Sequence, residues 1–296
     1  MKIMLLGKNG QLGWELQRSL ACLGELVALD RHSTTHCGDL SDPAGLADSV
    51  RVCRPDVIVN AAAYTAVDKA EGDEDMALTI NAQAPGVLAR EASVLGALLV
   101  HFSTDYVFDG SGQHAWTESD VPAPLNVYGQ TKLEGEQAIV AACPRHLIFR
   151  TSWVYAARGG NFARTMLRLA QEGERLTVID DQWGAPTGAD LLADVAAHCI
   201  RQVLQRPGDV GLYHLAASGQ TSWFGYAKHV LAQVMIDQHA TKIVAKEVLA
   251  VPSSAFVTAA ARPLNSRLDT RRLQAVFGLS LPPWQHGVDR LLAEIH

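Results

Sequence analysis

Cysteine is sparse in this chain of 296 residues. The five cysteines are odd in number and scattered, and no two are spaced as Cys-x-x-Cys, so the sequence indicates neither a disulfide framework nor a structural zinc site. The 11 histidines show no ligand spacing either. This usage is typical of a protein from a reducing compartment, so we expect a cytoplasmic location.

Long apolar runs and basic blocks are also missing. No segment approaches the ~18 consecutive apolar residues of a membrane helix, and the apolar run after Met1 is far shorter than the core of a signal peptide. A net charge of −6 without any basic block argues against nucleic acid or a membrane surface as partner. Because 48% of the residues are hydrophobic, we expect a globular protein with a small-molecule ligand.

Short apolar runs alternate with helical segments in the first half of the chain. We expect strands at 3–6, 26–29, 57–59, 97–101 and 146–149, and helices at 11–23, 43–52, in the stretch through 91, and at 127–142. Buried strands that alternate with helices predict right-handed parallel crossovers. The fold class is therefore α/β, a Rossmann-type doubly wound parallel sheet.

The alternation of strands and helices becomes less regular after Arg150, where glycine and proline residues separate shorter elements. Helices are expected at 161–171, 190–205, 223–237 and 284–294. We predict a cofactor-binding domain at residues 1–150 and a smaller, partly interleaved α/β substrate-binding region at 151–296, some elements of which return to the first domain.

The glycines Gly7, Gly10 and Gly13 stand between the first strand and the first helix. Small residues there let a pyrophosphate reach the backbone amides at the helix N-terminus, so this turn predicts a dinucleotide site. Asp30 ends the second strand about 20 residues later, where an acid commonly accepts hydrogen bonds from the adenosine ribose. The less favoured alternative is an ordinary strand-end aspartate, and the adjacent Arg31 leaves a 2′-phosphate possible.

Two further segments lie at the ends of later elements, on the same side of the predicted sheet. They are Asp39-Leu40 and Asn60-Ala61-Ala62-Ala63. The small alanines would let a dinucleotide lie flat, although close helix packing explains them as well.

Tyr128 and Lys132 share one helix face at i and i+4, which is the sharpest signal of the sequence. A cation ~5 Å from the phenol at an effective dielectric of ~20 favours the phenolate by ~3 kcal/mol, or about two pKa units. A solvated helix pair is the usual explanation of such spacing. Together with the glycine turn and with Ser103-Thr104 after the fourth strand, however, it predicts a proton donor, with Thr104 bonded to the same substrate oxygen.

These motifs resemble the extended short-chain dehydrogenases/reductases, and within them the dTDP-4-dehydrorhamnose reductase family. The resemblance covers nearly the full length, and its discriminating motifs come late: Arg150 to Tyr155, Gly184-Ala185-Pro186-Thr187 and Arg262-Pro263. It implies NADPH or NADH as cofactor and a dTDP-linked 4-keto sugar as partner. The expected activity is reduction of the C4 keto group of dTDP-4-dehydro-β-L-rhamnose to dTDP-β-L-rhamnose.

The resemblance also assigns residues. The catalytic set is Tyr128, Lys132 and Thr104. Cofactor contacts fall at Gly7, Gly10, Gln11, Leu12, Gly13, Asp30, Asp39, Leu40, Ala62, Ala63, Thr65, Tyr128 and Lys132. Substrate contacts fall at Thr104, Asp105, Tyr106, Trp153 and Arg262. Trp153 could instead be a core aromatic residue, and Arg262 a solvated loop residue.

Related dehydratases and epimerases share the glycine turn and the Tyr/Lys pair. The nucleotide-sugar 4,6-dehydratases have a Thr-Asp-Glu motif, whereas this chain has Tyr106 in the third position, which favours simple reduction. Two alternatives stay open: a reductase of another nucleotide-linked 4-keto deoxysugar, and a non-catalytic NADP-binding regulatory subunit.

The same family implies a homodimer joined through magnesium, with Glu15, Asp190 and Asp194 at the matching positions. Three carboxylates suit a hard divalent cation. Asp190 stands where a longer glutamate could sit, and the alternative is that it only complements the start of its helix while Asp194 is solvated.

Overall fold

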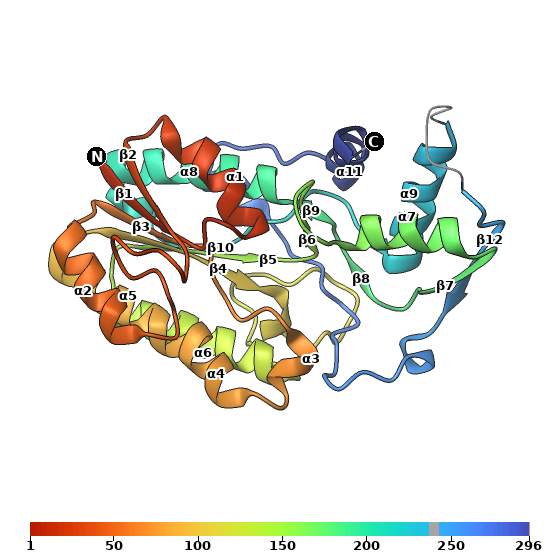
Figure 1. Ribbon diagram of the computed structural model, residues 1–296, viewed down its shortest axis with the longest axis horizontal. Coiled ribbons are helices and arrows are strands. Elements are labelled where there is room, and N and C mark those ends of the chain that lie inside the picture. The colour runs from red at the N-terminus through yellow and green to blue at the C-terminus, as the bar shows by residue number, and fades with distance from the viewer. Residues whose placement is uncertain (237–242, 296) are drawn as a thin grey trace.

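The structure is a computed structural model that describes residues 1–236 and 243–295. Strands and helices alternate in its first half (Figure 1). The strands are β1 (Lys2–Leu6), β2 (Glu25–Leu29), β3 (Val57–Asn60), β4 (Leu98–Thr104) and β5 (His146–Thr151). The helices are α1 (Gln11–Ala21), α2 (Pro43–Cys53), α3 (Val67–Ala70), α4 (Glu74–Leu78), α5 (Ala84–Leu95) and α6 (Val127–Ala142), with a π-helix at Thr79–Gln83 and a 3-10 turn at Asp105–Val107.

The second half contains shorter strands. They are β6 (Val154–Tyr155), β7 (Arg175–Ile179), β8 (Trp183–Gly184), β9 (Thr187–Gly188), β10 (Gly211–His214), β11 (Thr221–Ser222) and β12 (Glu247–Val251). The helices are α7 (Phe162–Glu172), α8 (Ala189–Gln205), α9 (Trp223–Ile236), α10 (Arg271–Phe277) and α11 (Trp284–Ile295), with 3-10 turns at Pro207–Asp209 and Ser253–Ala255. In the described ranges, no helix combines the length and the apolar character needed to cross a membrane.

Six strands form the central sheet, in the order β10-β5-β4-β3-β1-β2, and every neighbouring pair is parallel. The predicted doubly wound α/β fold is confirmed. The strand order reverses at β1, because β2 lies on one side of it and β3 on the other. In open sheets of this kind the crevice at the carboxyl ends of the strands flanking such a point is the usual ligand site.

Alternating side chains of the strands face opposite layers of helices. Ile3 and Leu5 of β1 join a core with α1 and α8, whereas Met4 and Leu6 join a core with α2 and α5. Figure 1 shows α1 and α8 on one face of the sheet and α2, α5 and α6 on the other. We call these layers, with β10, the sheet region.

A separate core holds α7, α9 and α11 together. It is rich in aromatic side chains, with Tyr155, Tyr226 and Trp284 buried among aliphatic neighbours, and β7 pairs with β12 at its edge. We call this part the aromatic region. Two elements from beyond Arg150 belong to the sheet region: α8 packs on its core and β10 pairs with β5. The division at residue 150 itself stays a prediction.

The predicted helices agree with the structure to within a few residues at their ends. Asp42 caps α2 by accepting a hydrogen bond from the Gly45 amide at 2.9 Å, as its position before Pro43 indicates. Ser103 and Thr104 are the last residues of β4 instead of following it. Asp237, the expected end of α9, lies outside the described residues.

Candidate active site

The glycine turn connects β1 to α1 at the point where the strand order reverses. Gly7 has a φ of 87°, a left-handed backbone conformation that favours glycine. A Cβ on Gly13 would lie only 2.0 Å from the Gly7 carbonyl oxygen, so the turn closes because both positions lack a side chain. Helix α1 has no side-chain cap at Gly10 and no acid in its first turn. Its first amides are free to bind an anion, and this arrangement fits the pyrophosphate of a dinucleotide.

Asp30 directly follows β2, as expected. Its carboxylate accepts hydrogen bonds from the His32 amide at 2.9 Å and from the Ser33 hydroxyl at 3.1 Å, and the Asn9 side chain donates to it as well. The His32 amide is the main cause of the lowered pKa of this carboxyl group. Asp30 is therefore held ionised beside the glycine turn.

The remaining predicted cofactor residues lie in the loops after β2 and β3. Asp39 accepts hydrogen bonds from the amide and hydroxyl of Ser41, and Leu40 is buried. Ala62 and Ala63 follow β3 and are half-buried, while Thr65 is exposed. A Cβ on Gly7 would lie 2.9 Å from the Ala62 nitrogen, so the glycine turn and the alanine segment meet.

Tyr128 and Thr104 meet where α6 starts against the end of β4. Asn126 caps α6 by accepting from the Gly129 amide at 2.8 Å, which places Tyr128 in the first turn. A Cβ on Gly129 would lie 2.2 Å from the Tyr106 carbonyl oxygen, so α6 is in direct contact with the 3-10 turn that follows β4. Burial raises the pKa of Tyr128 to about 12, and a hydrogen bond with the Thr104 side chain acts in the opposite direction.

Lys132 is buried one turn further along α6. Its Nζ donates to the Phe102 carbonyl oxygen at 2.6 Å and lies 3.0 Å from His101 Nε2. The expectation that Lys132 lowers the pKa of Tyr128 differs from the structure: the Tyr128 pKa is raised, and burial lowers the pKa of Lys132 to about 8. The i, i+4 spacing puts both residues on one helix face, but the lysine side chain turns toward β4.

Asp105 and Tyr106 extend this cluster. Asp105 is 3% exposed, and one of its carboxylate oxygens accepts a hydrogen bond from Thr104 at 3.2 Å. Burial raises the pKa of Asp105 to about 7. The ring of Tyr106 meets that of Tyr128 edge to face, with 5.7 Å between the ring centroids. The catalytic and substrate residues predicted around Thr104 thus lie together.

Trp153 belongs to the aromatic region. Its ring stacks on Trp223 with 3.7 Å between centroids, and a Cβ on Gly184 would lie 2.7 Å from it. It also has a φ of 49°, which is unusual for a residue with a side chain. Sequence reasoning missed Trp223 because its position marks only the start of a helix.

Arg262 is not a solvated loop residue. Its guanidinium donates to the carboxylate of Asp68 at 2.6 and 3.2 Å and lies beside Tyr106. Asp68 was not among the predicted site residues, since neither its spacing nor its neighbours distinguish it from other surface acids.

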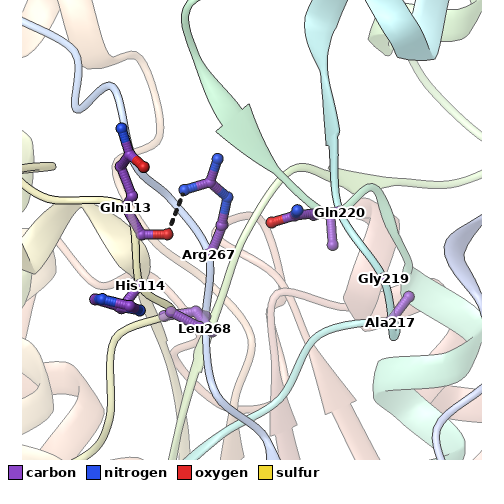
Figure 2. Close-up of a pocket in the computed structure, with 9 residues that line it drawn as sticks. Gln113, His114, Ala217, Gly219, Gln220, Arg267 and Leu268 are labelled. Atoms are coloured by element: carbon purple, nitrogen blue, oxygen red, sulfur yellow. Dashed lines mark hydrogen bonds between the residues drawn. The ribbon is translucent and has the colours of Figure 1, made fainter.

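Among the described residues, none of the predicted site residues lines a cavity of about 370 Å³. Figure 2 shows Arg267 in its centre, bonded to the Gln113 carbonyl oxygen at 2.9 Å, with the Gln220 carboxamide pointing toward it. The Arg267 guanidinium also lies over the Trp183 ring, 5.0 Å from the centroid. Ala185, from the Gly184-Ala185-Pro186-Thr187 motif, is one of its lining residues.

The three predicted magnesium ligands have arginine partners. Arg18 lies 2.9 Å from Asp194 and 3.5 Å from Glu15, and Arg290 lies 3.6 Å from Asp190. Across residues 1–236 and 243–295 no three metal-ligating side chains gather into a site. The magnesium bridge stays a prediction about an assembly of two chains.

The family can now be identified. A family model described as the RmlD substrate binding domain matches residues 1–296. The chain belongs to this family. The dTDP-4-dehydrorhamnose reductase of Escherichia coli K12 is 56% identical over 295 residues, covering 100% of this chain and 98% of that protein. The resemblance indicated by the motifs is confirmed.

Solved structures agree with this RmlD assignment. A dTDP-4-dehydrorhamnose reductase from Clostridium acetobutylicum matches with a TM-score of 0.89 at 34% identity, covering 99% of each chain. The Bacillus anthracis enzyme, solved in complex with NADP, matches with a TM-score of 0.86 at 34% identity and 99% coverage of each chain.

Proposed function

We propose that this RmlD-family chain is an NAD(P)H-dependent oxidoreductase that reduces the C4 keto group of dTDP-4-dehydro-β-L-rhamnose to give dTDP-β-L-rhamnose. The observation that carries the proposal is the contact of Tyr128 with Thr104 at the end of β4, in a sheet whose first turn fits a dinucleotide. The names of the full-length relatives support the same substrate.

The cofactor would be held by the free amides at the start of α1 and by Asp30. When bound, its reduced nicotinamide supplies a hydride to the carbonyl carbon. Tyr128, with a pKa of about 12, keeps its proton at neutral pH. It can therefore act as the general acid that protonates the substrate oxygen, while Thr104 orients that oxygen. Lys132 would contact the nicotinamide ribose.

Substrate binding is assigned to Asp105, Tyr106, Trp153 and Arg262. The last two come from the second half of the chain, which supports a cofactor-binding part at residues 1–150 and a mainly substrate-binding part at 151–296. Tyr106 occupies the position of the dehydratase glutamate, so the base needed for dehydration is missing from that position.

The direct test mixes the protein with NADPH and dTDP-4-dehydro-L-rhamnose and follows the loss of reduced-nicotinamide absorbance. Turnover with this sugar and not with other 4-keto deoxysugar nucleotides supports the assignment. Turnover with another sugar alone would favour a different reductase. Tight NADPH binding without any turnover would favour a regulatory subunit.

For the assembly, we propose a cytoplasmic homodimer with magnesium between Glu15, Asp190 and Asp194. Sedimentation with and without chelator is the measurement. A sedimentation mass that is the same with and without magnesium would contradict the metal bridge. A dimer that persists in Asp194→Ala would contradict it as well. Neither result would affect the catalytic assignment.

A further inference from the structure

The cavity around Arg267 contains a positive charge without a negative one. Its lining comes from three parts of the chain, within 113–115, 217–220 and 267–268, together with Ala185. Arg267 is the only arginine or lysine among these described residues, and none of them is an aspartate or glutamate. A volume of about 370 Å³ is within the range of small-molecule sites. The proposed reaction uses none of these residues.

One edge of the Arg267 guanidinium has no partner from the protein. Both hydrogen bonds that the described residues accept from this group come from Nη1, at 2.9 Å to the Gln113 carbonyl oxygen and at 3.4 Å to Asn265 Oδ1. Nε is buried without any hydrogen-bond partner. Nε and Nη2 form the edge that can donate two parallel hydrogen bonds to one oxyanion, and this edge is left over.

Three other arginines of this protein use the same edge to hold a carboxylate. In each, Nε donates at 2.8 to 3.0 Å and Nη2 donates to the same carboxylate. These pairs are Arg51 with Glu91, Arg150 with Glu136 and Arg271 with Asp269. Arg267 differs from them because no acid lines its cavity.

The charge of Arg267 is not compensated by a neighbouring acid in the described part of the chain. Burial lowers the pKa of its guanidinium, and no acid acts in the opposite direction. By contrast, carboxylates raise the pKa of Arg51 and of Arg271. A partly buried cation without a counter-charge is costly, and an anion in the cavity would reduce this cost.

The surroundings of the guanidinium suit an anion that is part of a small molecule. Figure 2 shows the Gln220 carboxamide pointing toward Arg267, where its NH₂ group can serve as a further donor. Leu268 and Ala217 provide apolar wall. Because one water takes up about 30 Å³, the cavity has space for on the order of ten non-hydrogen atoms, which exceeds a single carboxylate or phosphate group.

We propose that this cavity binds a small organic anion, whose carboxylate or phosphate oxygens accept two hydrogen bonds from Nε and Nη2 of Arg267. The Gln220 amide adds a third donor. The site is separate from the proposed catalytic residues. The experiments that test it need neither substrate nor cofactor, so their outcome does not depend on the proposed reaction.

NMR of protein labelled with ¹⁵N-arginine follows the Nε–H signal of Arg267, which is identified by its loss in Arg267→Gln. Inorganic phosphate and acetate are the two probes, in separate titrations, and sodium chloride at equal ionic strength is the control. The signal should move and saturate with at least one probe, and the tighter probe identifies the anion class. A signal that moves with neither probe, or equally with chloride, would overturn the proposal.

Arg267→Gln removes the donor edge, so anions should bind at least ~tenfold more weakly. The rise in melting temperature with added phosphate or acetate measures binding in every variant, because a ligand of the folded state stabilises it. Arg271→Gln is the matched control, since Asp269 already fills the edge of that arginine. Equal rises in the two variants would contradict a site at Arg267.

Gln220→Glu supplies the anion from within the chain. The new carboxylate, at an exposed position that tolerates substitution, should reach the Nε and Nη2 edge. The Arg267 signal should then stand near its anion-bound position without any probe and respond little to phosphate. Gln137→Glu adds the same charge on the exposed side of α6 and should leave the signal unchanged. If Gln220→Glu also leaves it unchanged, the edge does not face the cavity and the proposal fails.

Discussion

The sheet region and the aromatic region hold their site residues by different means. In the sheet region, Tyr128 and Thr104 are fixed by backbone: a capped helix start lies against a strand end with no space for a side chain at Gly129. In the aromatic region, Trp153 is fixed by the Trp223 ring and by the missing side chain at Gly184. Backbone contacts tolerate less displacement than ring stacking does.

This difference predicts that the two regions contribute to different steps of the reaction. Proton transfer needs the precision that the sheet region provides, whereas binding a sugar nucleotide can use the broad surfaces of aromatic rings. Variants in the sheet region should therefore change kcat or cofactor affinity, and variants in the aromatic region should change KM.

The largest effect is expected for Tyr128→Phe. The change removes only the hydroxyl group, so cofactor binding should survive while kcat falls by at least the ~100-fold typical of general acid catalysis. Steady-state kinetics and NADPH titration measure the two quantities. Near wild-type turnover would mean that another group donates the proton. Lys132→Met should differ by weakening cofactor binding as well.

Gly13→Ala should open the glycine turn. The new Cβ would lie 2.0 Å from the Gly7 carbonyl oxygen, so the backbone must move. Overpacking of this kind costs ~1 to 3 kcal/mol, which corresponds to a loss of about 5- to 150-fold in NADPH affinity if the strain falls on the turn. Fluorescence titration provides the measurement. Gly208→Ala, which has open space around its Cβ, is the matched control. Equal affinity in both variants would contradict the close turn.

Asp105 should make stability depend on pH. In the unfolded chain its carboxyl group ionises near pH ~4, but in the folded protein only near pH 7. Between these values the folded state binds more protons, so the free energy of unfolding falls as the pH rises through this window. Asp105→Asn should remove that part of the slope, as measured by urea unfolding from pH 4 to 8. Asp48→Asn, at an exposed position, controls for the lost charge. An unchanged slope in Asp105→Asn would mean that the carboxyl is not protonated in the fold.

Trp153→Ala should raise the KM for the sugar nucleotide by about five- to tenfold, because the loss of one aromatic face is worth ~1 to 1.4 kcal/mol. The Kd for NADPH should stay unchanged. Trp223→Phe keeps a ring beneath Trp153 and should change KM less. A fall in kcat with constant KM would mean that Trp153 contributes to the chemical step and not to substrate binding.

The smallest effect is expected for Asp30→Ala. The carboxylate favours NADH by accepting from the ribose and repels a 2′-phosphate, while Arg31 can pair with that phosphate. Both cofactors should work, and the variant should shift the ratio of kcat/KM values a few-fold toward NADPH. An unchanged ratio would mean that Asp30 does not contact the ribose.

Local patterns explain why so much of the sheet region could be predicted. Helix α6 has the predicted bounds, Val127–Ala142, because Asn126 is a strong cap. The glycine turn before α1 could be predicted because it directly follows the buried strand β1. The residues that prediction missed depend on distant contacts. Asp68 pairs with Arg262, Trp223 stacks on Trp153, and His101 reaches Lys132. No spacing along the chain encodes which residue a side chain meets after folding.

The position of β10 at the edge of the sheet sets the order in which the protein can assemble during synthesis. Its partner β5 is made about 60 residues earlier, and until Gly211–His214 leaves the ribosome β5 is an open edge strand with unpaired backbone groups. The nascent chain therefore passes through a stage at which the first five strands are present and the edge is uncovered. Such an edge can pair with another chain, so the nascent chain is open to aggregation at this stage.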